Sequence, residues 1–459
     1  MKHVYRQAGI AFVLVLIGFT LIHRGLHTAP PHILFITIDT LRRDHVGVYG
    51  APWPITPHID RLATRGAVFL RAYATAAWTP PAMASLLYGG TPVQHGVTDW
   101  NTPPVSRHIS WPKWLAHRYR YRTAFFTNHP GLAAPELQIR AQFQEWGFYG
   151  RPFQSADRLV NRVIEWARTH NWKTPTLLWV HFLDPHEPFQ PPPPWGDYWI
   201  QNTVPQPLLP HPAPRCAPDD MFGWNCIPPY ILKYTIDATA YHPERIRALY
   251  RADVAYTDAQ VGRLIGWITR WAAGYRWIVS ITADHGEIME TTHPIDPDMR
   301  IYFSHGTLLT DDLIRIPWIL YDTADTIAGA HIDTLVSQPD IPATVLALAG
   351  LRVPPNWAGY AVWRDGSWQN VRTWVTAWEL RVPAAVITDG DWKLWVTSTE
   401  TVVLRNGDIP VRTHAPQRLV RLVSRVQQWL HLRRADLQTA TPLPEDVQRD
   451  LRQIGYVGP

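Results

Sequence analysis

The sequence contains few cysteines and few charged residues, and each shortage excludes a class of protein. Cys216 and Cys226 are the only cysteines among 459 residues, which excludes a disulfide-rich scaffold and a four-cysteine zinc site. Charged residues make up 18% of the chain, and the net charge of +5 is too small and dispersed to favour nucleic acid as a partner. The hydrophobic share of 46% allows a large core and excludes a disordered or fibrous protein.

Histidine and proline, in contrast, are abundant. The 21 histidines suggest metal binding, and the 43 prolines indicate long ordered loops around a rigid scaffold. Twelve prolines fall within residues 185–218, where they exclude regular helix and central sheet. We therefore predict an irregular insertion over residues 185–230, leaving the active-site edge, because α/β patterning resumes after it.

The N-terminus predicts the compartment. Ala8 to Ile22 is an apolar run of 15 residues after Lys2 and Arg6, shorter than a typical span of about 20 and close to a signal-peptide core. Because no clear cleavage site follows, we predict an uncleaved signal-anchor over residues 1–30, with a buried core helix as the alternative. The catalytic part would then be extracytoplasmic, in the periplasm or outside the cell. There Cys216 and Cys226 would form a disulfide or remain two free thiols.

The next part of the chain predicts an α/β domain over residues 31–355. Continuous apolar runs typical of buried parallel strands alternate with helical periodicity such as that of Ile246–Trp267. This alternation predicts a large central, mainly parallel sheet flanked by helices. The strand-like runs are His32–Ile38, Thr123–Thr127, Leu177–Phe182, Trp277–Thr282 and Pro317–Tyr321.

A small C-terminal α+β subdomain is predicted over residues 356–459. Short runs there read as antiparallel strands with turns at Asp389-Gly390 and Asn406-Gly407. An apolar stripe from Leu419 to Leu430 lies opposite arginines and predicts an amphipathic helix. We expect this helix to pack on the small sheet; the alternative is that it lies on a membrane. The strands expected are Val371–Trp378, Ala384–Thr388, Trp392–Ser398 and Thr401–Leu404.

Candidate chemistry gathers where predicted strands end. Asp39 ends the first strand, and Asp284 and His285 end the strand from Trp277; such strand ends meet at one edge of a parallel sheet. Thr79 stands before two prolines, a pattern typical of an N-cap residue at the start of a helix. The N-terminus of a helix favours anions. These oxygen and imidazole ligands suit one divalent cation, Mg²⁺, Mn²⁺ or Ca²⁺, with Zn²⁺ also possible. Such a cation would activate the Thr79 hydroxyl as a nucleophile; the alternative is that Thr79 only caps a helix.

Several segments together resemble one family. Residues 36–50 read ITIDTLRRDHVGVYG, which closely resembles the opening of sulfatase-like hydrolases in the alkaline phosphatase superfamily. Further segments resemble the family in the same order, so the resemblance runs from about residue 31 to residue 457. These are TPHIDRL at 56–62, ASLLYG at 84–89, HFLDPHEP at 181–188, TADHGE at 282–287, RIP at 315–317, DIPAT at 340–344 and LRQIGYV at 451–457.

The resemblance implies an alkaline phosphatase-like fold and a metal-dependent esterase. Asp39, Asp284 and His285 match the family's metal ligands. Thr79 falls at the position of the nucleophile, which also contacts the metal. Glu287 follows Asp284-His285-Gly286, and the alternative to a role in the site is that it only complements a helix N-terminus.

The resemblance also implies residues around the substrate. His186 matches a histidine that contacts the substrate or protonates the leaving group, and His305 matches a lysine of arylsulfatases or a histidine of other relatives. Asn128 and His95 align more loosely with substrate-binding positions. His181, inside an apolar strand, is expected to support the site rather than to bind the metal.

The sequence departs from true sulfatases at the nucleophile. Those enzymes carry cysteine or serine in Cys/Ser-x-Pro-x-Arg, which is converted to formylglycine, whereas here Thr79 and Met83 occupy the first and last positions. Threonine cannot give the aldehyde hydrate. Together with His285, where many sulfatases have asparagine, this resembles the phosphoryl-transfer branch.

We therefore predict a metal-dependent hydrolase of phosphate esters, such as phosphodiesters or phosphonate esters, and less readily of sulfate esters. Alternatives are a sulfatase, a phosphoethanolamine- or phosphoglycerol-type transferase acting on envelope lipids or glycans, and a non-catalytic metal-binding protein. The expected partners are a small-molecule, lipid or glycan ester and, through the N-terminal helix, a membrane.

Overall fold

The computed structural model describes most of the chain between Pro30 and Asp436. Within these ranges, no helix combines the length and apolarity needed to cross a bilayer. The predicted anchor, the cysteine pair, the Asn406-Gly407 turn and most of the proline-rich insertion lie outside the described residues. In the described part of the insertion, α7 Trp195–Thr203 is a helix, so the expectation that the prolines exclude regular helix there was wrong. The helix forms because residues 195–203 contain no proline. The described ranges are 30–105, 109–150, 156–203, 243–289, 291–293, 296–379, 384–405 and 408–436.

The main sheet has the strand order β11-β2-β10-β6-β1-β5-β3-β4, with β9 paired to β2. Strand β1 lies in the middle and is parallel to both β5 and β6, which confirms the mainly parallel sheet. One expected strand, β10, runs antiparallel to β6 and β2. The strands are β1 His32–Ile38, β2 Ala67–Tyr73, β3 Arg122–Thr127, β4 Glu145–Phe148, β5 Thr176–Phe182, β6 Trp277–Ala283, β9 Arg315–Ile316, β10 Trp318–Asp322 and β11 Ala330–Ser337.

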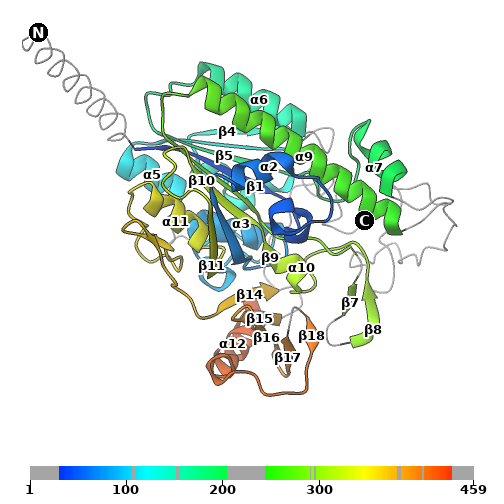
Figure 1. Ribbon diagram of the computed structural model, residues 1–459. Helices are drawn as coiled ribbons and strands as arrows, with labels where there is room; N and C mark the ends of the chain where they lie inside the picture. Colours follow the sequence, from blue (N-terminus) through cyan, green and yellow to red (C-terminus); the bar gives the residue numbers. More distant parts are fainter. Residues whose placement is uncertain are drawn as a thin grey trace, which may run out of the picture.

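Helices cover both faces of this sheet (Figure 1). Helices α2, α6 and α9 pack together on one face, and α3, α5 and α11 pack on the other. The described helices of this domain are α2 Pro57–Ala63, α3 Thr79–Tyr88, α4 Pro92–His95, α5 Trp111–Tyr119, α6 Ala156–Thr169, α7 Trp195–Thr203, α9 Pro243–Trp271, α10 Asp311–Ile314 and α11 Asp340–Leu348.

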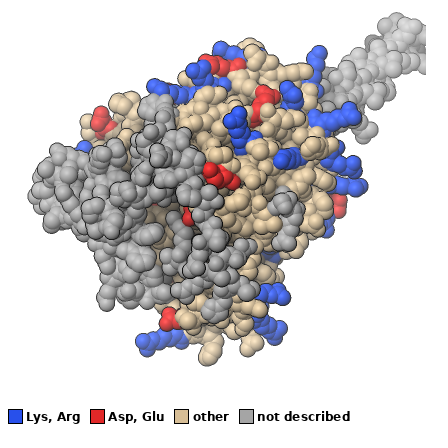
Figure 2. Space-filling view, turned by 180° about the vertical axis from the view of Figure 1, so that it is seen from behind, with Lys and Arg blue, Asp and Glu red and all other residues tan. Residues whose placement is uncertain are grey.

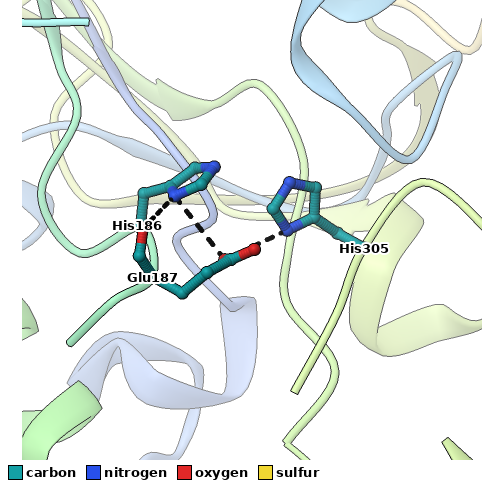
Figure 3. A group of neighbouring side chains, drawn as sticks. All are labelled: His186, Glu187 and His305. Carbon is teal, nitrogen blue, oxygen red and sulfur yellow. Dashed lines mark hydrogen bonds and ion pairs between the residues drawn. The ribbon is translucent and has the colours of Figure 1, made fainter. Parts of the chain in front are cut away.

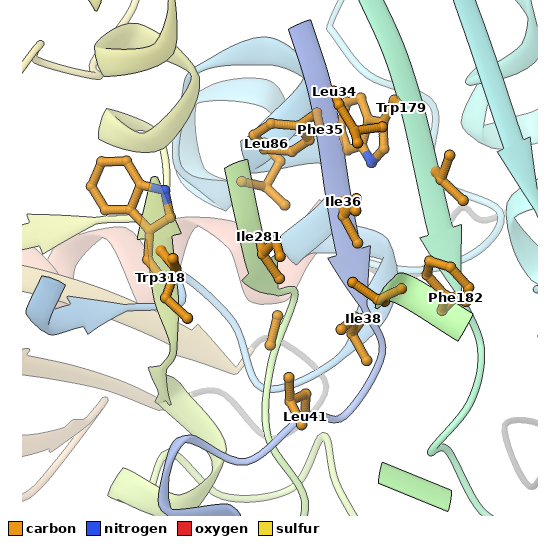
Figure 4. Packing of buried hydrophobic residues seen from close by; sticks show 14 of the residues in the cluster. Leu34, Phe35, Ile36, Ile38, Leu41, Leu86, Trp179, Phe182, Ile281 and Trp318 are labelled. Carbon is orange, nitrogen blue, oxygen red and sulfur yellow. The ribbon is translucent and has the colours of Figure 1, made fainter. Parts of the chain in front are cut away.

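The core is built around β1, whose seven residues are all buried. Figure 4 shows Leu34, Phe35 and Ile36 packed among side chains from the neighbouring strands and from α3. Each fully buried side chain of this kind contributes about 1.5–3 kcal/mol relative to exposure. A strand buried on both faces needs a continuous apolar run. Because β1 is buried in this way, it holds rigidly the polar residue that follows it, Asp39.

The C-terminal sheet is antiparallel, as predicted, in the order β14-β15-β16-β17-β18. The strand expected from Val371 begins only at Val375, because Arg372 turns away to form an ion pair with the buried Asp340. Leu419, Val426 and Leu430 of α12 are buried against this sheet, so α12 packs as expected. The elements are β14 Val375–Glu379, β15 Ala384–Thr388, β16 Trp392–Thr397, β17 Thr401–Arg405, β18 Ile409–Pro410 and α12 Gln417–Asp436; the remaining short strands are β7 Thr291–His293, β8 Asp296–Ile301, β12 Trp363–Arg364 and β13 Ser367–Trp368.

Candidate active site

The carboxyl ends of β1 and β6 bring the two aspartates together. These strands are parallel, and Ile38 pairs with Ala283 at their ends. The following residues, Asp39 and Asp284, therefore lie side by side at the edge where parallel sheets bind ligands. Neither side chain is exposed to solvent.

Thr79 reaches the same place from the start of α3. Its Oγ1 lies 3.5 Å from Asp39 Oδ2 and 3.3 Å from His285 Nε2. The N-cap position is taken by Trp78, without a side-chain cap bond, and Thr79 is the first helical residue. The expectation that Thr79 is the N-cap was thus wrong by one position, and its hydroxyl faces the Asp39 carboxylate.

These residues fit a cation. Asp39 Oδ1 and Asp284 Oδ2 make no hydrogen bond with any described residue, and each lies 3.5 Å from His285 Nε2. Burial raises the pKa of Asp39 well above its usual range, and the adjacent Asp284 carboxylate raises it further. Burial also raises the pKa of Asp284. Two buried carboxylates in contact are costly unless a cation neutralises them.

The tautomer of His285 suits a metal ligand. Its Nδ1 lies 2.8 Å from the carbonyl oxygen of Gly286, so the Nδ1 hydrogen is donated there. The lone pair of Nε2 then faces Thr79 and the two aspartates. This arrangement, with one nitrogen held by a carbonyl and the other facing carboxylates, is usual for metal-ligating histidines.

Two further histidines contact Asp39. His181 Nε2 lies 3.5 Å from Asp39 Oδ2, and ligand atoms of Asp39, His181 and Asp284 lie within 4.8 Å of one another. Because His181 Nδ1 bonds to the Thr37 hydroxyl at 2.8 Å, the role of Nε2 depends on the tautomer. The expectation that His181 supports the site rather than binding the metal stays a prediction.

His129 is a contact that the sequence reasoning left without a role. Its Nδ1 accepts a hydrogen bond from the backbone N–H of Gly131 at 3.0 Å, so Nε2 carries the proton. That Nε2 lies 3.4 Å from Asp39 Oδ2, where it can donate to the carboxylate. The available signal was position: His129 follows the end of β3, at the same edge as Asp39.

A second group of side chains adjoins the first. His186 and His305 face each other with ring centroids 4.8 Å apart, and His305 lies equally close to His285. Figure 3 shows the Glu187 carboxylate between the Nδ1 atoms of the two rings. This group therefore adjoins His285, whose Nε2 also lies near Thr79 Oγ1.

The two histidines of this group have opposite protonation. Burial lowers the pKa of His186 to about 4; its Nδ1 hydrogen is donated to the Glu187 carbonyl at 2.6 Å, leaving Nε2 as a base. Burial would also lower the pKa of His305, but Glu187 and Glu287 outweigh it and hold that pKa well above the ordinary value. A neutral and a protonated imidazole side by side form an acid–base pair.

Glu287 has a different position from the one expected. No helix begins after it, because Ile288 forms a β-bridge with Ser304, so the expected complement to a helix N-terminus was wrong. Glu287 Oε2 instead lies 3.1 Å from His305 Nδ1, and Glu187 Oε2 lies 3.3 Å from the same atom. The two carboxylates hold the protonated His305 in place.

His95 and Asn128, the two residues assigned more loosely, form hydrogen bonds within the protein. His95 Nδ1 accepts from the Val97 N–H at 3.1 Å, and its Nε2 bonds to Ser85 Oγ on α3 at 3.0 Å. Asn128 donates to Asp184 Oδ2 and accepts from the Leu183 N–H, both at 2.7 Å. These bonds support α3 and the loop that carries His186; substrate contact by His95 or Asn128 stays a prediction.

Comparisons with known proteins agree with the resemblance seen in the sequence. The family model described as Sulfatase matches residues 31–351. An arylsulfatase of Clostridium perfringens is 22% identical over 404 residues, covering 73% of this chain and 80% of its own. The structure of BT4656 in complex with its substrate D-glucosamine-2-N,6-O-disulfate has a TM-score of 0.69 at 17% identity, covering 89% of this chain and 100% of its own. A phosphonate monoester hydrolase of Agrobacterium radiobacter has a TM-score of 0.63 at 20% identity, covering 88% of this chain and 96% of its own.

Proposed function

The chain belongs to the sulfatase family of ester-hydrolysing enzymes, and we propose that it cleaves its substrate with Thr79 as the nucleophile. The supporting observation is the contact of Thr79 Oγ1 with Asp39 Oδ2 and His285 Nε2 at 3.5 and 3.3 Å. The hydroxyl stands at the N-terminus of α3, where the helix dipole favours an anionic ester.

Asp39, Asp284, His285 and the Thr79 oxygen would hold one divalent cation, Mg²⁺, Mn²⁺, Ca²⁺ or Zn²⁺. When bound, this cation supplies positive charge to the ester oxygen and favours the deprotonated Thr79 oxygen. The protein's part is to hold the nucleophile, the carboxylates and the imidazole in fixed positions in a buried site.

His305 and His186 transfer the protons that the reaction requires. Thr79 Oγ, which has already released its proton to solvent, forms a bond to phosphorus while the bond from phosphorus to the leaving oxygen breaks, and protonated His305 gives its proton to that oxygen. In the second step a water oxygen attacks phosphorus, the bond to Thr79 breaks, and the water proton passes to a neutral histidine. His186 stands 4.8 Å from His305, ring to ring; it takes that proton as the base and passes it to His305, which restores the starting protonation of both.

Residue 79 also supports a preference for phosphoryl over sulfuryl esters. A sulfated threonine has no second hydroxyl through which to expel sulfate, whereas a phosphorylated threonine is resolved by water. The relatives include both an arylsulfatase and a phosphonate monoester hydrolase, so the threonine itself carries the preference. The candidate substrates are small-molecule, lipid or glycan esters, and the enzyme would work outside the cytoplasm, anchored by residues 1–30.

The test compares kcat/KM for an aryl phosphodiester, an aryl phosphonate ester and an aryl sulfate with the same leaving group and metal. The phosphorus esters should be turned over faster. If the sulfate is the better substrate by a wide margin, the enzyme is a sulfatase and the argument from Thr79 fails.

A further inference from the structure

Aromatic side chains surround the first residue of β1. His32, the first residue of β1, donates its backbone N–H to the Arg276 carbonyl at 2.9 Å. Its ring lies 5.0 Å from the ring of Tyr275 and 5.4 Å from that of Trp172. Tyr121 donates its hydroxyl to the Pro31 carbonyl at 2.7 Å. Three loops that precede β3, β5 and β6 therefore converge on residues 31 and 32.

Two aromatic side chains next to the loop before β6 are exposed. Trp271 is 64% and Tyr275 40% exposed; Trp271 ends α9, and Tyr275 lies in the short segment between α9 and β6. Trp271 also stacks on the Trp267 ring, at 5.4 Å between centroids, which fixes its orientation. Rigid, exposed Trp and Tyr side chains, apolar with a polar tip, are typical of the interface between a bilayer and water.

Exposed cations lie in the same loops and in the last turns of α5 and α9, which lead into them. Lys173, Arg118, Arg120 and Arg270 are exposed, and none of them forms an ion pair within the described part of the chain. Figure 2 shows Lys and Arg predominating over Asp and Glu along the right-hand side of the molecule, which is the left-hand side of Figure 1, where β1 begins. Such cations favour a negatively charged lipid surface.

We propose that this amino-terminal edge of the main sheet docks on an anionic lipid bilayer, with Trp271, Tyr275, Lys173 and Arg270 at its centre. The apolar run Ala8–Ile22 supports this partner over a glycan or a protein. Only seven residues separate Ile22 from Pro30, a length that spans at most about 25 Å. A bilayer that holds the run is therefore within reach of the edge.

This orientation restricts the substrate, in a step that rests on the proposed function. The seven residues of β1 place Asp39 about 23 Å from the docked edge, at about 3.3 Å per residue. Thr79, beside Asp39, would then face away from the bilayer. The enzyme acts on water-soluble esters or extended glycans rather than on headgroups of the bilayer that it contacts.

Site-specific quenching tests the docking. The full chain, with Cys216→Ser and Cys226→Ser, carries a single fluorophore at Ala273→Cys in the proposed surface or at Pro54→Cys near the active-site edge. Each is reconstituted into vesicles of phosphatidylcholine and phosphatidylglycerol that contain a headgroup spin-labelled lipid. The label at 273 should be quenched at least threefold more than the label at 54. Equal quenching, or stronger quenching at 54, would overturn the proposal, whatever the result of the esterase assay.

A charge reversal separates docking from simple tethering. Lys173→Glu with Arg270→Glu should reduce quenching at 273 by at least half, as should omission of phosphatidylglycerol. Arg412→Glu with Arg421→Glu, an equal charge change at exposed positions of the C-terminal subdomain, should leave it unchanged. If the first pair has no more effect than the second, the edge lies near the membrane only because of the tether, and the docking surface is refuted.

Discussion

The Thr79 hydroxyl lies 3.5 Å from the Asp39 carboxylate, although 40 positions separate the two residues in the sequence. Asp39 is fixed by the end of a strand that is buried along its whole length, and Thr79 by the start of a helix whose ten residues are all buried. The contact is therefore a property of the rigid core, and substitutions at Thr79 should change chemistry more than stability.

Replacement of Thr79 by alanine should reduce kcat by at least about a thousandfold, because the bond-forming oxygen is lost. The free energy of unfolding should change by no more than about 1 kcal/mol, since the substitution removes one hydroxyl and leaves the buried helix otherwise intact. Thr79→Ser should retain measurable turnover, and Thr64→Ala, at an exposed position, should behave as wild type. Ester hydrolysis undiminished in Thr79→Ala would remove this residue from the mechanism.

Asp39→Asn should have opposite effects on stability with and without metal. A cation at a hundred times its dissociation constant stabilises the native state by about 2.7 kcal/mol, so metal-loaded wild type should melt well above the variant. Without metal, the variant should melt at the same temperature or higher, because it lacks one of two buried carboxylates in contact. Thermal melts with and without chelator, with metal analysis, measure this; Asp333→Asn is the exposed control. A variant that binds metal like wild type would argue against Asp39 as a ligand.

His305→Gln should affect substrates according to their leaving groups. An acid that protonates the leaving oxygen matters most when that oxygen is strongly basic. The variant should therefore lose activity on alkyl esters at least tenfold more than on nitrophenyl esters. The same loss for both classes would indicate that His305 only holds the site together.

Asp258 should make the protein less stable as the pH rises. Burial raises the pKa of Asp258 to about 7 from 3.8, while its oxygens accept the N–H groups of His58 and Ile59 at the start of α2. Between these pH values the folded protein keeps a proton that the unfolded chain releases, so stability falls by up to about 1.4 kcal/mol per pH unit. Denaturant melts between pH 4 and 7 should show a flatter profile for Asp258→Asn than for Asp333→Asn. An unchanged slope would show that Asp258 is ionised throughout.

The parts of the fold that the sequence predicted are those with strong local patterns. β1, β5 and β6 are buried along their length, and each reads as a continuous apolar run. The pattern of apolar residues in a strand does not show in which direction the strand runs in the sheet, so the antiparallel pairing of β10 was not predictable. β11 carries His331 and Asp333 in its first half and was missed because these residues interrupt the continuous apolar run by which the other strands were identified.

The same distinction applies to the site. Asp39, Asp284 and Thr79 were predictable because strand ends and a helix start converge on one edge of a parallel sheet. The contacts of Glu187 and Glu287 with His305 were not predictable from the sequence. The three residues lie on three different loops, and tertiary packing decides how these loops approach one another. His129 shows the same limit: its donation to Asp39 follows from a hydrogen bond to Gly131 that no sequence pattern specifies.

The most direct test of the account is to trap the covalent intermediate. The enzyme is mixed with an aryl phosphodiester, quenched in acid within milliseconds, digested and analysed by mass spectrometry. The account predicts a phosphoryl adduct on Thr79, absent from Thr79→Ala and accumulating when the metal is present. Steady turnover without any adduct at residue 79, together with an active Thr79→Ala enzyme, would contradict it.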